Sequence, residues 1–139
     1  MNTFTMNTSM NPFENTLSSD KLFNKQAEVI QEIADKDDCI IVGRCAGYIL
    51  RDEPKCVRIY ISADKDFRTK RIMASDHLDE KEAQKKIHSM DKKRDSYFGY
   101  YAGQDWKACH TYDLSISTSA LGIDKAVDLI CQYIDIKFK

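Results

Sequence analysis

Strand-like segments alternate with helical repeats along this chain, and that alternation limits its fold more than any other feature. The continuous apolar run at 39–42 is typical of a strand buried on both faces, and 57–62 and 112–118 also have strand patterns. Between and around these segments, apolar residues recur at helical spacing over 20–36, 44–52, 65–75, 79–97 and 123–134. This order predicts an α/β protein, with a parallel sheet and flanking helices in three layers.

Side chains that can cap helices mark several helix starts. Asp64 can cap the helix that follows the segment 57–62, and Asp79 with Glu82 has the spacing of a capping box. The helix that Asp79 opens is expected to end near Tyr97. Residues 98–112 are rich in Gly, Tyr and Trp, and are predicted to be irregular.

The polar N-terminal segment differs from the rest of the chain. Residues 1–18 are rich in Asn and Thr and show no structural period, which predicts a flexible polar arm. Ser19 can cap a helix that begins at Asp20. The remaining residues, 19–139, are few enough to form one domain around one hydrophobic core.

The overall charge and hydropathy restrict the partners. The formal net charge is -1, which counts against nucleic acid and against an anionic membrane surface. No apolar run is long enough to span a bilayer, and the N-terminus lacks the pattern of a signal peptide. A cytoplasmic location is therefore expected, and local basic clusters can still bind a small anion.

The five cysteines are odd in number and widely spaced, and no CxxC occurs. This pattern favours reduced, mostly buried thiols over a disulfide framework. It also gives no spacing typical of a metal site, so none is predicted.

Arg44 is the first candidate for a functional residue. It follows Gly43 directly after the apolar run 39–42, so it is expected at the carboxyl edge of the sheet, where open α/β proteins bind ligands. An arginine there can hold a phosphate or carboxylate through two parallel hydrogen bonds. The alternative is a structural pairing with a helix C-terminus or a surface acid.

Two further basic clusters lie later in the chain. Arg68 and Arg71 are three residues apart and share a helix face near the same edge, although a solvated face is the preferred explanation of this cluster taken alone. Residues 92–94 lead into an aromatic segment that ends at Trp106, a mixture that suggests a mobile flap closing on an anion. The same mixture can stack nucleic acid bases, or can simply be a basic helix end beside core aromatics.

Four stretches in this order resemble the cytidylate kinase-like family of nucleoside monophosphate kinases. They are "IIVGRCAGYIL", "VRIYISADKDFRTKRI", "AQKKIHSMDKKRDSYFGYYAGQDW" and "YDLSISTSALGIDKAVDLI", and the resemblance covers roughly residues 22–134. It implies a P-loop kinase-like fold and transfer of the γ-phosphoryl of ATP to a CMP-like nucleoside monophosphate, with Mg²⁺.

The resemblance also implies roles for single residues. Gly43 and Arg44 would bind the acceptor nucleotide, and Lys93 and Arg94 would be catalytic members of a basic lid. The ATP side would be formed by Arg68, Arg71, Ser119 and Ala120. Such groups suit phosphoryl transfer, because its catalysis consists mostly of positioning and of stabilising charge.

This sequence departs from the family pattern in two places. Cys45 and Gly47 stand where family members carry an Asp after the Gly-Arg pair or two residues further on. No glycine of the chain lies in a GxxxxGK[ST] phosphate loop, so the N-terminal strand and P-loop of the family are not found in these residues. We therefore expect a shortened member with negligible kinase activity, whose incomplete sheet is repaired by homodimerisation or strand exchange. The alternatives are a non-catalytic nucleotide-binding or regulatory module, and a module that binds RNA or single-stranded DNA.

Overall fold

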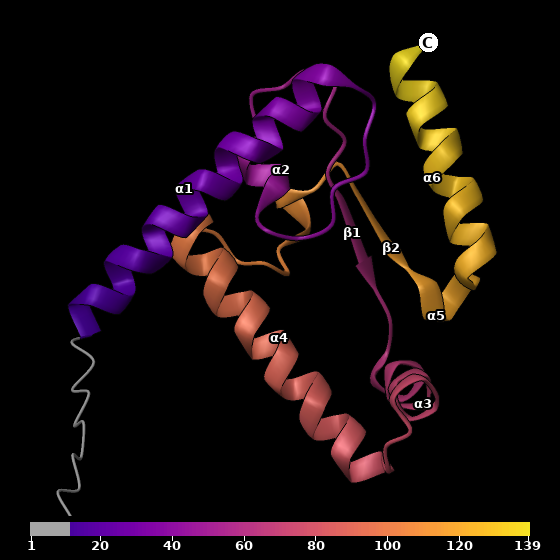
Figure 1. Cartoon of the computed structure of the whole chain (residues 1–139). Coiled ribbons are helices and arrows are strands. Elements are labelled where there is room, and N and C mark those ends of the chain that lie inside the picture. The colour runs from indigo at the N-terminus through magenta and orange to yellow at the C-terminus, as the bar shows by residue number, and fades with distance from the viewer. Residues whose placement is uncertain (1–11) are drawn as a thin grey trace, which may run out of the picture. The chain divides into compact units, whose positions relative to one another are not determined.

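The computed structural model describes residues 12–139, and side chains from residue 18 onward. It divides into two compact units, one ending at Leu50 and the other running from Arg51 to Lys139 (Figure 1). The first unit contains helices α1 (Pro12–Lys36) and α2 (Ala46–Ile49). The elements of the second unit are β1 (Ile59–Ser62), α3 (Lys65–Asp76), α4 (Glu80–Ala102), the 3₁₀ helix η1 (Cys109–Thr111), β2 (Leu114–Ser117), α5 (Thr118–Leu121) and α6 (Ile123–Phe138).

Helix α1 starts earlier than the sequence indicated. Residues 12–18, expected in a flexible arm, form its first turns, and the rest of that predicted arm lies outside the described residues. Pro12 is the first helical residue, where its missing N–H leaves no hydrogen bond unmade. The predicted end at Lys36 is confirmed, and Ile30 is buried on the apolar face.

Residues 39–42 are not a buried strand, which corrects the prediction made from their apolar run. They follow α1 without regular structure, and Ile40 and Val42 are 95% and 88% exposed. A strand needs a neighbour to satisfy its N–H and C=O groups, and the two-stranded sheet contains only β1 and β2. Apolar composition alone therefore did not make these residues a strand.

The sheet of the second unit is parallel, as predicted, but it has two strands in the described residues. Ile59 is paired with Leu114, and the register continues to Ser62 and Ser117. The predicted three-layer arrangement is not confirmed in residues 12–139. The predicted strands 57–62 and 112–118 are confirmed in position, and each is shorter than expected.

An ion pair fixes the amino ends of the two strands. The Asp113 carboxylate accepts hydrogen bonds from the Arg58 backbone N–H (2.7 Å), Nε (3.2 Å) and Nη2 (3.1 Å). The Asp113 N–H in turn donates to the Arg58 carbonyl at 2.8 Å. The hydrogen bonds from Arg58 hold the pKa of Asp113 below its usual range. The register of the two strands is therefore held by side-chain contacts as well as by the backbone hydrogen bonds between the strands.

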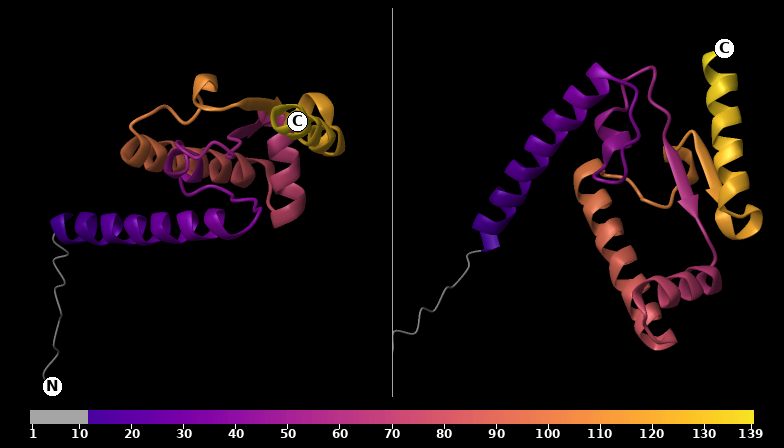
Figure 2. Two further views of the ribbon diagram at one scale, coloured as in Figure 1. Left: turned by 90° about the horizontal axis from the view of Figure 1, so that it is seen from above. Right: turned by 45° about the vertical axis from the view of Figure 1, so that its right-hand side comes forward.

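Capping carboxylates begin α3 and α4, as the sequence predicted. Asp64 accepts a hydrogen bond from the Phe67 N–H at 2.8 Å. The Asp79 carboxylate accepts from the Glu82 N–H at 2.8 Å, and the Glu82 carboxylate accepts from the Asp79 N–H at 3.1 Å. Both helices pack against each other, and α3 meets α4 at a steep angle in both views of Figure 2.

Helix α4 ends later than predicted. It continues through Tyr97 and Gly99 to Ala102, so residues 98–102 are helical rather than irregular. Gly103 adopts a left-handed φ of 65° and its N–H donates to the Gly99 carbonyl, which closes the helix. The stop is therefore the second glycine of this stretch, and Gly99 is an ordinary helical residue.

Small side chains form the interior of the second unit. Ala83 of α4 is fully buried, and Ala102, Ile116 and Ala126 are nearly so. Among the described residues no large side chain is completely buried. Helix α6 is confirmed, but its predicted apolar face is only partly covered, since Val127 is exposed while Ala126 is buried.

The five cysteines all lie in the described part of the chain and are free thiols. Only Cys45 is buried, so the expectation of mostly buried thiols was wrong. No helix among residues 12–139 combines the length and apolar character needed to cross a bilayer.

Candidate functional site

Hydroxyl groups gather at the carboxyl ends of β1 and β2. The Ser62 Oγ donates to the Ile116 carbonyl at 3.2 Å, and the Thr118 Oγ1 donates to the Ser62 carbonyl at 3.1 Å. The Ser119 Oγ lies 3.0 Å from the Ser117 Oγ and accepts a hydrogen bond from the Asp64 N–H at 3.0 Å. The start of α5 is thereby connected to both strands and to the start of α3.

Ser119 and Ala120 were predicted to lie on the ATP side of a nucleotide site. The structure places both in α5, directly after β2. Ser119 is half-buried and uses its hydroxyl in the contacts just described, whereas Ala120 is exposed beside it. Their role toward a nucleotide stays a prediction.

Asp91 brings together two of the predicted arginines. Its carboxylate accepts two parallel hydrogen bonds from Arg68, each 2.7 Å long, and lies 3.6 Å from Nη1 of Arg94. Arg68 comes from α3 and the other two residues from α4, so helix packing creates the cluster. We call these three residues the arginine–aspartate array. It is partly buried, which strengthens its electrostatics relative to an exposed pair.

The charges in the array shift each other's protonation equilibria. The hydrogen bonds from Arg68 hold the pKa of Asp91 below its usual range, and those bonds raise the pKa of Arg68. Asp91 is therefore ionised at neutral pH. It presents the two guanidinium groups side by side, with Arg94 half-exposed.

An aromatic cluster lies against the outer arginine. The Arg94 guanidinium carbon is 5.9 Å from the centre of the Trp106 ring, within the range of a cation–π contact. Tyr60 of β1 packs edge-on to Trp106 at 5.7 Å, and the Tyr112 hydroxyl donates to the Trp106 carbonyl at 2.6 Å. The cluster connects the array to the sheet and orients Arg94.

The structure does not bring every predicted residue into this array. Arg71 and Lys93 lie on α3 and α4, exposed and outside the contacts of Arg68 and Arg94. Residues 92–94 lie within a continuous helix, so the basic part of the predicted flap is not irregular. The aromatic residues around Trp106 do follow the helix end at Gly103.

Gly43 and Arg44 belong to the first unit, where the described residues before them form no strand, so the predicted position of Arg44 at the carboxyl edge of a strand was wrong. Gly43, Arg44 and Cys45 have φ values of 77°, 55° and 56°, three successive residues in the left-handed region. Such a conformation strains Arg44 and Cys45, which carry a Cβ. The turn leads into α2 and leaves Arg44 exposed, whereas burial raises the pKa of the Cys45 thiol to about 11.

Sequence reasoning missed Asp91, Tyr60 and the role of Trp106 as the surface under Arg94. Asp91 lies three residues before Arg94, a helical spacing that could have indicated their contact. Arg68, which binds Asp91 more closely, is 23 residues away in the sequence, and no local sequence pattern predicts a contact over that separation.

The residues present do not by themselves fit a Mg²⁺ site. In the described part of the chain, no three His, Cys, Asp or Glu side chains are grouped as metal ligands. Asp91, the carboxylate nearest to the predicted arginines, is already bound by them. The Mg²⁺ implied by the resemblance stays a prediction.

The parallel strands, the hydroxyl cluster and the arginine–aspartate array define an α/β protein with a cationic site beside its sheet. Residues 1–120 match the model of the cytidylate kinase-like family. The chain therefore belongs to that family, which confirms the resemblance stated above.

Three curated relatives are similar to this chain, and all are called cytidylate kinase. The protein from Sulfolobus acidocaldarius is 31% identical over 103 residues, covering 74% of this chain and 56% of the relative. The match to the Methanoculleus marisnigri protein is 27% over 111 residues, covering 80% and 59%. The Desulfurococcus amylolyticus protein is 29% identical over 108 residues, covering 76% and 57%. The chain thus spans between 56% and 59% of the length of these relatives.

A solved structure is also similar. An uncharacterized protein from Eubacterium ventriosum ATCC 27560 superposes with a TM-score of 0.81 and 37% sequence identity, covering 84% of this chain and 73% of that one. Its fold therefore extends over most of the present chain.

Proposed function

We propose that the arginine–aspartate array handles phosphate in a nucleoside monophosphate kinase site, which transfers the γ-phosphoryl of ATP to a CMP-like acceptor. The observation that carries this proposal is the pair of guanidinium groups, Arg68 and Arg94, held side by side by one carboxylate. The proposal is also supported by the family match and by relatives that are called cytidylate kinase.

The array suits the charge changes of phosphoryl transfer. An acceptor phosphate oxygen attacks the γ-phosphorus, the bond to the bridging oxygen breaks, and ADP leaves with the electron pair. Negative charge is carried by the transferring group and the leaving oxygen during this step. Guanidinium groups that are oriented beforehand stabilise that charge without reorganising. Arg94 is the group better placed to meet a ligand, since it is half-exposed while Arg68 is bound bidentately.

The remaining residues receive roles by resemblance. Arg44, on the backbone turn at Gly43, is proposed to bind the acceptor phosphate, and its exposed side chain leaves it accessible. Lys93 is proposed to add charge to the lid, and Arg71 with Ser119 to the ATP side. CMP is the proposed acceptor because the three relatives carry the name cytidylate kinase.

We further propose that these 139 residues alone bind nucleotide but turn it over negligibly. The sequence holds no GxxxxGK[ST] loop, whose backbone N–H groups and lysine would cradle the β- and γ-phosphates. The second candidate function is a non-catalytic nucleotide-binding module. It is favoured by the lack of a GxxxxGK[ST] loop in the sequence.

Titration calorimetry with ATP and with CMP tests the site. Arg94→Gln should weaken ATP binding by about tenfold, the loss of roughly one charge-assisted contact. Lys70→Gln removes an exposed cation of α3 outside the array and serves as the matched control, with a change below about twofold. Equal affinity of the Arg94 variant and the parent chain would exclude the array as a nucleotide site.

A coupled assay with ATP and CMP tests turnover separately. No phosphorylation above the uncatalysed background is expected from the purified 139-residue chain. Measurable CMP phosphorylation would overturn the proposed impairment and would itself support the kinase function.

A further inference from the structure

A groove between α3 and α4 is lined by more cations than carboxylates, and three of those cations, Lys65, Lys81 and Lys85, lie outside the array. It encloses about 630 Å³, a volume within the range of small-ligand sites. The side chains that line it include Lys65, Arg68, Lys81, Lys85, His88 and Asp91. Asp91 is the one carboxylate among its lining residues, and that group is already paired with Arg68.

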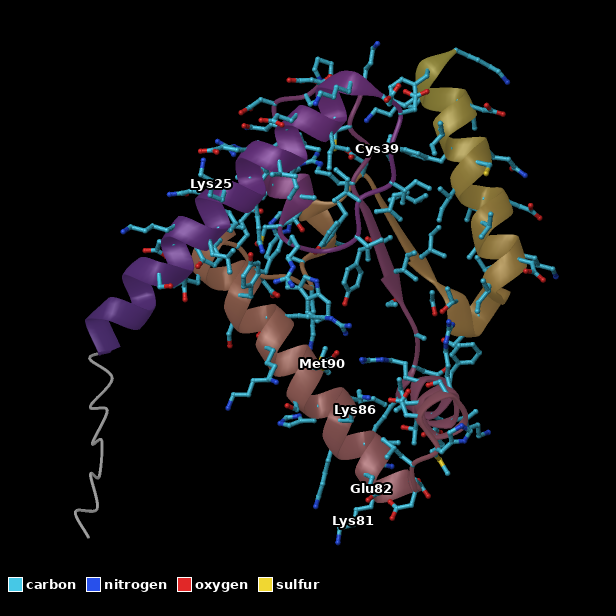
Figure 3. The ribbon with its side chains drawn as sticks, viewed as in Figure 1. Lys25, Cys39, Lys81, Glu82, Lys86 and Met90 are labelled. Carbon is cyan, nitrogen blue, oxygen red and sulfur yellow. The ribbon has the colours of Figure 1, made fainter. Side chains whose placement is uncertain are left out.

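Three lysines in this groove lack a carboxylate partner. Among the side chains described, those from residue 18 onward, none forms an ion pair or a hydrogen bond with the amino groups of Lys65, Lys81 or Lys85. By contrast, Lys86, one residue further along α4, is paired with Asp76 of α3 (Figure 3, where Lys86 is labelled). The two helices thus pair one lysine and leave the groove lysines to solvent.

Nearby acids are engaged elsewhere. Glu80 accepts a hydrogen bond from Gln84, and Glu82, labelled beside Lys81 in Figure 3, completes the capping box with Asp79. The first turn of α4 therefore uses its carboxylates for helix formation rather than for neutralising the groove.

The positions of the groove lysines are unfavourable for the helices themselves. Lys65 and Lys81 lie in the first turns of α3 and α4, where the helix dipole disfavours cations. Lys81 and Lys85 are four residues apart on one helix, a spacing at which like charges repel. An anion in the groove would relieve all three conflicts at once.

We propose that this groove binds an oligophosphate, a small anion with several adjacent phosphate groups. The cations come from two helices and face a common volume, so an elongated multivalent anion can contact both sides. The volume suits a small ligand rather than an extended nucleic acid, and the net charge of -1 disfavours a nucleic acid partner. The site goes beyond the proposed kinase function, since neither Lys81 nor Lys85 belongs to the array.

Calorimetric titration with inorganic tripolyphosphate tests this site. The double variant Lys81→Gln/Lys85→Gln should weaken binding by about tenfold or more. The control Lys70→Gln/Lys125→Gln removes two exposed lysines outside the groove and the same total charge, and should change binding by less than about twofold. Lys81→Arg/Lys85→Arg keeps the charge and should retain binding.

Two results would overturn the proposal. One is an equal loss of tripolyphosphate binding in the groove variant and in the control variant, which would indicate unspecific charge attraction. The other is the absence of tripolyphosphate binding to the parent chain; binding of a single-stranded RNA oligonucleotide that the groove variant abolishes would then assign the groove to nucleic acid. Competition by ATP distinguishes the source of the ligand: displacement of tripolyphosphate supports the phosphate chain of a nucleotide, and its absence supports a free oligophosphate.

Discussion

In residues 51–139, α3 and α4 begin at capping carboxylates and the two strands are fixed by an ion pair; in residues 12–50, α2 begins at a strained left-handed turn. Asp64 and Asp79 supply the caps, and Arg58 with Asp113 holds the strand register. In the first unit, Ile40 and Val42 follow α1 without regular structure, and both side chains are almost fully exposed. The difference teaches that a local signal is most reliable where a side chain also satisfies backbone groups, as Asp64, Asp79 and Asp113 do, whereas an apolar run without a partner strand stays irregular.

The largest expected effect contrasts two isoleucines. Ile116→Ala removes a side chain that is 4% exposed in β2 and should lower the free energy of unfolding by about 3 kcal/mol. Ile40→Ala removes one that is almost fully exposed and should change it by less than about 0.5 kcal/mol. Urea unfolding followed by circular dichroism measures both. A comparable loss in Ile40→Ala would show that residues 39–42 are covered in solution.

The strand-end ion pair should matter next. Asp113→Ala removes the acceptor of three hydrogen bonds from Arg58 and should cost about 2 kcal/mol of unfolding free energy. Asp113→Asn keeps one acceptor oxygen and should lose less. If Asp113→Ala unfolds at the same urea concentration as the parent, the pair does not hold the register.

The stability of the second unit should fall as the pH is lowered into the acid range. The pKa values of Asp91 and Asp113 are lowered in the folded state by hydrogen bonds from Arg68 and Arg58. Their contribution is complete above the unfolded carboxyl pKa of about 4 and is lost as pH falls through the lower folded values. Stability should thus be level from about pH 7 to 5 and fall below about pH 4.

The double variant Asp91→Asn/Asp113→Asn provides the matched comparison for this acid effect. It should be less stable at neutral pH and lose less on acidification. Some slope should remain, because Asp64 and Asp76 also have lowered pKa values. An unchanged acid slope would assign the effect to those other groups.

The smallest expected change in stability is in the first unit, and it is a gain rather than a loss. Arg44→Gly relieves a left-handed residue that carries a Cβ and should stabilise α2 by about 1 kcal/mol. The amides of Tyr48, Ile49 and Leu50 donate within this turn, so their hydrogen exchange should slow by about fivefold. Faster exchange in Arg44→Gly would mean that the arginine side chain itself stabilises the turn.

Helix starts and strand positions in the second unit were predictable because local groups specify them. Asp64 and the Asp79–Glu82 box are readable from spacing, and the strands β1 and β2 from their apolar patterns. The end of α4 was not predictable from the sequence, since either Gly99 or Gly103 could end the helix. The left-handed backbone conformation of Gly103 shows that the helix ends there.

The candidate site was predicted only in part. Arg68 and Arg94 could be identified from the resemblance, but the carboxylate that joins them depends on how α3 packs on α4. The prediction of a strand at 39–42 was wrong for a similar reason, since an apolar run becomes a strand only when a neighbouring strand can pair with it. Contacts between distant residues thus decide what short patterns leave open.

The Arg58–Asp113 contact also bears on the order in which the chain folds. It joins residues 55 positions apart, so closing the parallel pair before anything else has formed requires a long loop and a large loss of chain entropy. Helices α3 and α4 lie inside that loop and carry local caps, so they can form first and shorten it. We expect the strand pair to form late, and the folding rate to be set by this non-local closure rather than by the helices.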